Sequence, residues 1–217
     1  MPAAVAARPR DVRGYPVPAI TPWDSGSPVF AATGTARTYL CAVERRCSIC
    51  ALPMAPGPVW RVVAGEEAAA IADALASGHE YRNLAATAEA PGHRACMLYA
   101  AVVCPYLARP QARRGSEATA IGLAAAKGSR RGDGGAVASF GQLQWRHVPG
   151  TGMLFRFAGL VEFLPHAEGA DQLPALAAAV AAEAASDEVA PAYLLADEAA
   201  VDARLHHYVP PGHLPDA

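Results

Sequence analysis

Residues 47–50 read Cys-Ser-Ile-Cys and residues 93–96 read His-Arg-Ala-Cys, and these two stretches decide the fold. The two-residue spacer of the first stretch lets one tight turn aim both sulfurs the same way. The His and Cys of the second stand three residues apart, so that one helical turn places both on the same face. Three thiolates and one imidazole make the donor set of a closed, tetrahedral Zn²⁺ site. The sequence therefore predicts a structural zinc ion with four ligands: Cys47, Cys50, His93 and Cys96.

The segments around the two motifs predict how the site is built. Pro91-Gly92 is a helix entry, and the apolar run Met97–Val103 indicates a helix that opens at the second motif. A knuckle followed by ligands on the first turn of a helix is the order of a treble-clef zinc finger. Between the motifs, Val59–Val63 favours a hairpin strand and Glu66–Leu75 favours a helix. That helical insert accounts for the 42 residues that separate the two motifs.

The C-terminal part of the chain predicts a β-β-α unit. Residues 142–148 alternate apolar and polar side chains, a Pro-Gly-Thr-Gly turn follows, and residues 153–164 favour a second strand. A helix is expected over 170–185, with Pro174 tolerated in its first turn, and a last short helix over 197–207. We therefore expect an α+β protein, in which a treble-clef-like zinc finger with a helical insert is followed by a β-β-α unit.

Shifts in composition divide the chain into four predicted parts. The first residues are rich in Pro, Gly, Ala and Thr, and X-Pro steps favour extended backbone, so we expect an arm that packs onto the body through Trp23, Val29 and Phe30. Residues 38–45 are expected to form a short strand or turn leading into the knuckle. The four parts are the extended N-terminal arm (1–38), the zinc-binding treble-clef-like domain (39–108), a basic flexible linker (109–137) and the β-β-α unit (138–217).

Charge is distributed unevenly along a chain of 217 residues whose formal net charge is −2 and whose pI is about 6.4. No global field therefore draws the protein to nucleic acid. The middle of the chain is nevertheless basic, and the part that follows residue 161 is acidic, with Arg204 as its only basic side chain other than His. The basic stretch predicts a weak, salt-dependent contact with nucleic acid through six side chains: Arg109, Arg113, Arg114, Lys127, Arg130 and Arg131.

Cysteine usage and hydropathy indicate the compartment. The five cysteines lack the pattern of a secreted disulfide framework, and the two metal-ligand spacings favour a reducing environment. The first residues hold no hydrophobic stretch long enough for a signal peptide, and no run approaches the roughly 18 to 20 apolar residues that span a bilayer. We expect a cytoplasmic protein with no membrane contact, whose partner is a protein or a small molecule.

Other polar residues leave two enzymatic alternatives open. His79 and Asn83 precede His93 in the order of an HNH-like nuclease, but the first two stand only four residues apart and His93 is already assigned to zinc. A second alternative is an enzyme of unknown reaction, with a pocket between the finger and the β-β-α unit. Its candidate polar groups are His79, Arg94, His147 and Arg156. No nucleotide-binding or serine-hydrolase motif is present.

The remaining cysteines and histidines are expected to be structural or exposed. Cys104 lies about two helical turns after the second motif, roughly 12 Å along a helix, and is expected to pack in the core. Cys41 is a weaker substitute ligand. The C-terminal group is expected on the surface: Asp202, His206, His207, His213 and Asp216.

The two motifs and their flanks also resemble a known group of sequences. Residues 47–53 read Cys-Ser-Ile-Cys-Ala-Leu-Pro, residues 91–96 read Pro-Gly-His-Arg-Ala-Cys, and Tyr99 and Cys104-Pro105-Tyr106-Leu107 follow. This pattern resembles uncharacterised bacterial and phage-associated proteins with CWVCG-x-PLG and PPSHRxCAxxAxxxCPFLxxP elements, over about residues 15 to 110. The chain departs at Ala51, where the family has a Gly that permits a positive φ. The resemblance implies the metal site and carries no activity.

The motifs lead to one main hypothesis of function. We expect a zinc-stabilised binding or accessory protein of unknown partner, and the enzyme alternatives come second. A deep pocket lined by two or more of the four candidate polar groups would favour the enzyme.

Overall fold

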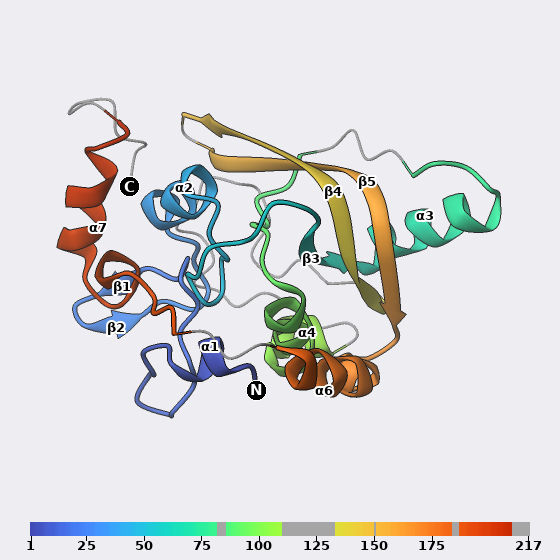
Figure 1. The fold of residues 1–217 in the computed structure, drawn as a ribbon, viewed down its shortest axis with the longest axis horizontal. Helices are drawn as coiled ribbons and strands as arrows, with labels where there is room; N and C mark the ends of the chain where they lie inside the picture. Colours follow the sequence, from blue (N-terminus) through green and yellow to red (C-terminus); the bar gives the residue numbers. More distant parts are fainter. Residues whose placement is uncertain (82–85, 110–132, 150, 184–186, 210–217) are drawn as a thin grey trace.

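The computed structural model describes residues 1–81, 86–109, 133–149, 151–183 and 187–209, and within them the protein has a mixed α+β fold (Figure 1). Its main sheet has three antiparallel strands in the order β3-β4-β5: β3 (Val59–Ala64), β4 (Gly135–Val148) and β5 (Gly152–His166). A small second sheet pairs β1 (Trp23–Asp24) with β2 (Ser27–Pro28). The helices are α1 (Ala3–Ala6), α2 (Thr35–Val43), α3 (Gly65–Ala76), α4 (Arg94–Val103), α5 (Pro105–Ala108), α6 (Leu173–Ala182) and α7 (Glu198–Leu205), with short 3₁₀-helices η2 (Gly169–Gln172) and η3 (Ala192–Leu194).

Strand β3 joins the metal-motif half of the chain to the C-terminal half. It was expected in a hairpin of the finger, but it pairs with β4 from Val59 opposite Phe140 to Ala64 opposite Gly135. The two predicted C-terminal strands are confirmed as β4 and β5, and both are longer than expected. The linker expected at 109–137 is wrong at its end, because β4 already begins at Gly135.

The main sheet is covered on both faces, which explains the apolar run in β3. Successive strand residues point to opposite faces. Val63 therefore packs with Phe140 and with Ile71 of α3, whereas Val62 packs against α4 and α6. Leu98 of α4 lies in this second cluster and is fully buried.

A buried arginine lies under the sheet on the α3 side. Arg61 is 1% exposed, and its guanidinium lies 4.8 Å from the ring centre of Phe157. Its Nη1 donates to Glu89 Oε2 at 3.2 Å and its Nη2 donates to Glu67 Oε1. Tyr81 also donates to Glu67, at 3.1 Å. The charge is therefore paired where α3 meets the sheet.

The segment before the knuckle is a helix, so the short strand or turn expected at 38–45 is wrong. Helix α2 buries Leu40 and Cys41 against Val201 and Leu205 of α7. Its partner lies about 160 residues further along the chain, and the sequence around 38–45 gives no sign of it. Tertiary packing thus overrides a weak local preference.

Charged groups tie α7 to α2 and its flanks. Arg204 of α7 donates to Glu44 at 2.8 Å, and Arg46 donates to the other oxygen of the same carboxylate at 2.7 Å. Arg37 of α2 is fully buried and donates to Glu198 at 2.8 Å. These contacts fix the C-terminal helix beside the start of the metal-motif region.

The N-terminal arm packs onto the body through residues other than those expected. Val17 and Ala19 are fully buried, whereas Phe30 is 42% exposed and Trp23 and Val29 are only half-buried. The backbone N–H of Ala19 donates to Ile49 at 3.0 Å, inside the first motif.

Four helices confirm the prediction from sequence, whereas α5 was not predicted and α1 lies in the stretch expected to be extended. Helix α3 matches the predicted insert, and α4 opens at the second motif. Helix α6 carries Pro174 in its first turn, and the Asp197 side chain caps α7 by accepting from Ala200 at 3.0 Å. In the described parts of the chain, no helix is long and apolar enough to cross a membrane.

Candidate metal centre

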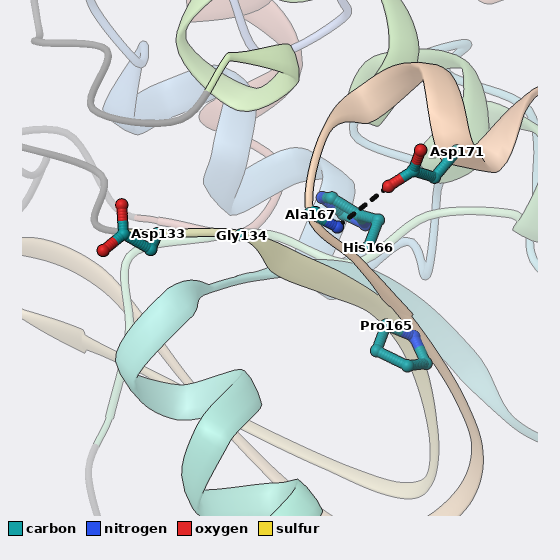
Figure 2. Close-up of a pocket in the computed structure, with 6 residues that line it drawn as sticks. All are labelled: Asp133, Gly134, Pro165, His166, Ala167 and Asp171. Atoms are coloured by element: carbon teal, nitrogen blue, oxygen red, sulfur yellow. Dashed lines mark hydrogen bonds between the residues drawn. The ribbon is translucent and has the colours of Figure 1, made fainter.

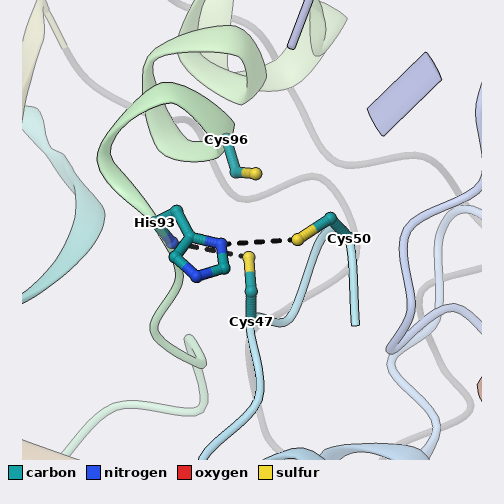
Figure 3. A group of neighbouring side chains, drawn as sticks. All are labelled: Cys47, Cys50, His93 and Cys96. Carbon is teal, nitrogen blue, oxygen red and sulfur yellow. Dashed lines mark hydrogen bonds between the residues drawn. The ribbon is translucent and has the colours of Figure 1, made fainter. Parts of the chain in front are cut away.

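The four predicted ligands come together between the knuckle loop and the start of α4 (Figure 3). Their ligand atoms all lie within 4.8 Å of one another, and the three sulfurs belong to buried residues. Cys50 Sγ lies 3.4 Å from His93 Nδ1. Tetrahedral bonds of ordinary zinc–sulfur and zinc–nitrogen length place such a pair about 3.6 Å apart. The group could therefore hold one metal ion.

The knuckle loop is closed by backbone hydrogen bonds. The N–H of Ala51 donates to Cys47 O at 2.9 Å, and the N–H of Cys47 donates to Leu52 O at 2.9 Å. Ala51 has a φ of +68°, the left-handed conformation that glycine adopts at least cost. The alanine accepts a strain of about 1 to 2 kcal/mol there. The turn thus forms at the position where the resembling sequences carry glycine.

His93 is held by groups on both sides of its ring. It is the N-cap residue of α4, and its backbone N–H donates to Cys47 Sγ at 3.4 Å. Its Nε2 lies 3.0 Å from Pro53 O, so that the Nε2–H donates to this carbonyl. In the neutral ring that a metal ion requires, this bond keeps the proton on Nε2, so that Nδ1 faces the sulfurs with its lone pair.

Gly92 allows the helix entry to approach the knuckle closely. A Cβ at this position would lie 2.8 Å from Cys47 Sγ and 2.4 Å from Met97 Cε. The Gly92 backbone exchanges two hydrogen bonds with Trp60 of β3, at 2.9 and 3.1 Å. The glycine cannot move away from the sulfur without breaking this bridge to the sheet.

We expect Gly92→Ala to lower the affinity of the site for zinc by about tenfold or more, because the methyl group displaces the Cys47 sulfur. Competition with a chromophoric chelator measures this. Gly141→Ala is the control, because the nearest atoms to its added Cβ lie 3.6 and 3.7 Å away. If Gly92→Ala and wild type had the same zinc affinity in this competition, Gly92 would not be needed to leave space for the Cys47 sulfur.

The electrostatics of the group favour a cation. Burial lowers the pKa of the His93 imidazole, but hydrogen bonds to the sulfurs of Cys47 and Cys50 outweigh burial and raise this pKa to about 11. Burial raises the pKa of Cys47, yet hydrogen bonds from its three neighbours in the group leave that pKa well below its ordinary value. A thiolate and an imidazolium therefore stand side by side. A metal ion must displace these protons, so metal affinity falls as pH is lowered.

A buried arginine lies close to the group. Arg8 is 3% exposed, and it donates from Nε to Val17 O at 2.9 Å and from Nη2 to Leu194 O at 2.6 Å. Its Nη1 finds no partner among the described residues. Burial and the nearby Arg37 lower the pKa of Arg8 to about 10, and the sulfurs of Cys41, Cys50 and Cys47 act in the opposite direction. The sequence analysis missed this residue, because one arginine in a Pro-rich arm carries no signal of burial.

The other cysteines lie outside the group. Cys41 is buried in the cluster between α2 and α7, and burial raises the pKa of its thiol. Cys104 is half-buried at the junction of α4 and α5. All five cysteines are free thiols.

The candidate polar groups of the enzyme alternative are not brought together. His79 and Arg156 are exposed, Arg94 donates to Glu162 at 2.9 Å, and the His147 ring lies 6.5 Å from that of Tyr39. An open hollow of about 520 Å³ lies elsewhere, and Figure 2 shows the residues that line it. A second cavity holds only about 20 Å³. Neither is lined by any of the four: the hollow is lined by Asp133, Gly134, Pro165, His166, Ala167 and Asp171, and the second cavity by Thr33, Thr35, Thr38, Ala88, Thr151, Gly152 and Met153.

Several predicted residues fall outside the described part of the chain. Asn83 of the nuclease alternative is one of them. His206, His207 and Asp202 are exposed as expected, whereas His213 and Asp216 lie outside the described residues. Of the basic stretch, Arg109 is described and exposed. The others lie outside: Arg113, Arg114, Lys127, Arg130 and Arg131.

No family model, curated protein sequence or solved structure matches this chain.

Proposed function

We propose that the four-residue group holds a structural Zn²⁺ in a closed, treble-clef-like site, and that this cytoplasmic protein acts by binding a partner. The membership of the chain in the bacterial and phage-associated family it resembles is part of this proposal. The observation that carries it is the convergence of four ligand atoms within 4.8 Å. Four protein ligands fill the tetrahedral coordination that Zn²⁺ prefers, and a catalytic zinc keeps one position open for water.

The chemistry of the donor set also supports a structural role. Three thiolates place much negative charge on a zinc ion, which weakens its ability to polarise a substrate or ionise water. The group is also tied to both the arm and the sheet by backbone hydrogen bonds at Ile49 and Gly92. A metal ion there would join parts of the chain that are far apart in sequence. Thiols in this number favour a reducing compartment.

The enzyme alternatives gain no support from the described residues. Neither of the cavities reported above is lined by His79, Arg94, His147 or Arg156, and Asn83 lies outside the described residues. We therefore place the function in binding.

Metal analysis of the purified protein tests the proposal directly. We expect one zinc per chain by elemental analysis, and X-ray absorption at the zinc edge should give three sulfur neighbours and one nitrogen neighbour. Cobalt substitution should give the intense visible bands of a tetrahedral thiolate site. A water ligand in place of one side chain, or a chain that purifies folded without metal, would contradict a closed structural site.

Arg8 provides a prediction about the charge of the site. Zn²⁺ with three thiolates and a neutral imidazole carries one net negative charge, which Arg8 balances from a buried position. Arg8→Met keeps most of the stem and removes the charge, and we expect it to lower zinc affinity by about tenfold. Chelator competition measures this, with the exposed Arg10→Met as control. Equal affinities of the two variants would show that Arg8 serves the packing of the arm alone.

A further inference from the structure

Strands β4 and β5 continue beyond the three-stranded sheet as a two-stranded ribbon. Strand β3 pairs with β4 only as far as Phe140 within the described residues, whereas β4 and β5 stay paired up to Val148 opposite Gly152. We call residues 141–148 and 152–160 the ribbon. Apart from a bridge between Thr87 and Phe155, its strands pair only with each other in the described chain. Figure 1 shows the ribbon running across the molecule to end near α2.

The two faces of the ribbon have different surroundings. The inner face packs on the body: the Trp145 ring lies 5.9 Å from that of Tyr39 in α2, and Phe155 and Phe157 are buried. This contact holds the ribbon in place. The outer face is largely exposed. Its exposed polar side chains are Gln142, Gln144 and Arg146 on β4, with Arg156 opposite Gln144 on β5, and the apolar side chains on this face are the exposed Ala158 and the half-buried Leu154.

The outer face is positively charged in a chain that is negative overall. Between Asp133 and Glu162 the sequence has no acidic residue, although the chain has a net charge of −2. The side chains of Arg146 and Arg156 make no hydrogen bond or ion pair with the described residues. Two guanidiniums on one face that form no ion pair with a described residue indicate an anionic partner.

We propose that the outer face of the ribbon binds double-stranded nucleic acid. A two-stranded β-ribbon fits the major groove of B-DNA, and glutamine and arginine are side chains that hydrogen-bond base edges and phosphates there. An acidic polypeptide would need the two arginines but would give no role to Gln144, which neighbours both of them, or to Gln142, which follows Gln144 on the same face. The inference deepens the proposed binding function and rests on it, and it names the partner class.

The expected affinity is weak, because only two cations face the partner. Non-specific complexes of this kind have dissociation constants of about 1 to 100 μM, and each phosphate contact adds about 0.9 to the slope of log K against log salt. We expect micromolar binding at 50 mM salt that largely disappears at 200 mM.

Fluorescence anisotropy with a labelled 20-base-pair duplex tests the proposal. We expect Arg146→Gln/Arg156→Gln to bind about tenfold more weakly at 50 mM salt, with a salt slope shallower by about 2. Gln144→Glu places a carboxylate between the two arginines and should abolish binding. Arg10→Gln/Arg13→Gln removes the same charge from another exposed surface and should bind like wild type.

Three outcomes would overturn the proposal. One is duplex binding that the ribbon variants leave unchanged; an Arg113→Gln/Arg114→Gln variant that alone loses binding would assign the contact to the basic stretch. Another is wild-type protein that binds labelled polyglutamate and no duplex, which would assign the face to an acidic polypeptide. The third is a wild type that binds neither probe. Zinc content and melting temperature are measured on every variant. A variant that loses duplex binding but keeps zinc and native melting tests the ribbon alone, whereas loss of zinc shows that the metal site is affected.

Discussion

Cys96→Ser will leave the protein largely unfolded at 25 °C. Binding of structural zinc contributes about 10 kcal/mol or more in isolated zinc fingers, because the unfolded chain does not hold the ligands together. The whole stability of a natural domain is only about 5 to 15 kcal/mol. Circular dichroism and zinc content measure the outcome, and Cys47→Ser is expected to behave the same way.

Cys104→Ser is the matched control for this experiment. Cys104 is a half-buried free thiol outside the group of four, so the variant should keep one zinc per chain and melt close to wild type. If Cys96→Ser also kept one zinc and native melting, the four-ligand assignment would be wrong.

Arg61→Met will destabilise the protein by about 2 to 3 kcal/mol. The guanidinium is buried against Phe157, and its loss removes one ion pair from each of the carboxylates of Glu67 and Glu89. Breaking a fully buried pair costs about 3 to 5 kcal/mol, and the partial exposure of both glutamates reduces that figure. Thermal melting of the zinc-loaded protein should fall by about 5 to 10 °C.

Arg94→Met serves as the comparison. Arg94 pairs with Glu162 and lies over the Trp60 ring, but its side chain is 38% exposed, so its loss should cost less than about 1 kcal/mol. If the two variants lowered the melting temperature equally, the burial of Arg61 would not increase the contribution of its ion pairs to stability.

Local patterns predicted much of this fold. Helices α3, α4, α6 and α7 follow from apolar spacing and end signals within their own segments, and the β4–β5 hairpin follows from alternation around a turn. Each pair of metal ligands could likewise be recognised from a short stretch of sequence, because a two-residue spacer restricts the directions in which two side chains can point. Predicting the metal site also required the pair Cys47 and Cys50 to meet the distant pair His93 and Cys96. The donor chemistry suggested this contact, because together they supply the four ligands of one zinc ion.

Long-range partners account for what the sequence did not predict. Helix α2 forms against α7, so its helical state does not follow from nearby residues. The strand at β3 was predicted, but its pairing with the distant β4 was not. Arg8 and Arg61 are buried because distant carbonyls and carboxylates meet them. An arginine in a sequence is ordinarily expected to be exposed to solvent. The burial of these two side chains can be seen only in the folded chain.

The hydrogen bond from Arg8 to Leu194 has a consequence for synthesis. The two residues are 186 positions apart, so a ribosome working at about 5 to 20 residues per second makes the acceptor about 10 to 40 s after the donor. The partners of the arm at Ser48 and Ile49 emerge much earlier. We therefore expect the arm to dock on the knuckle while the chain is still being made, and the Arg8 contact to close only when η3 arrives.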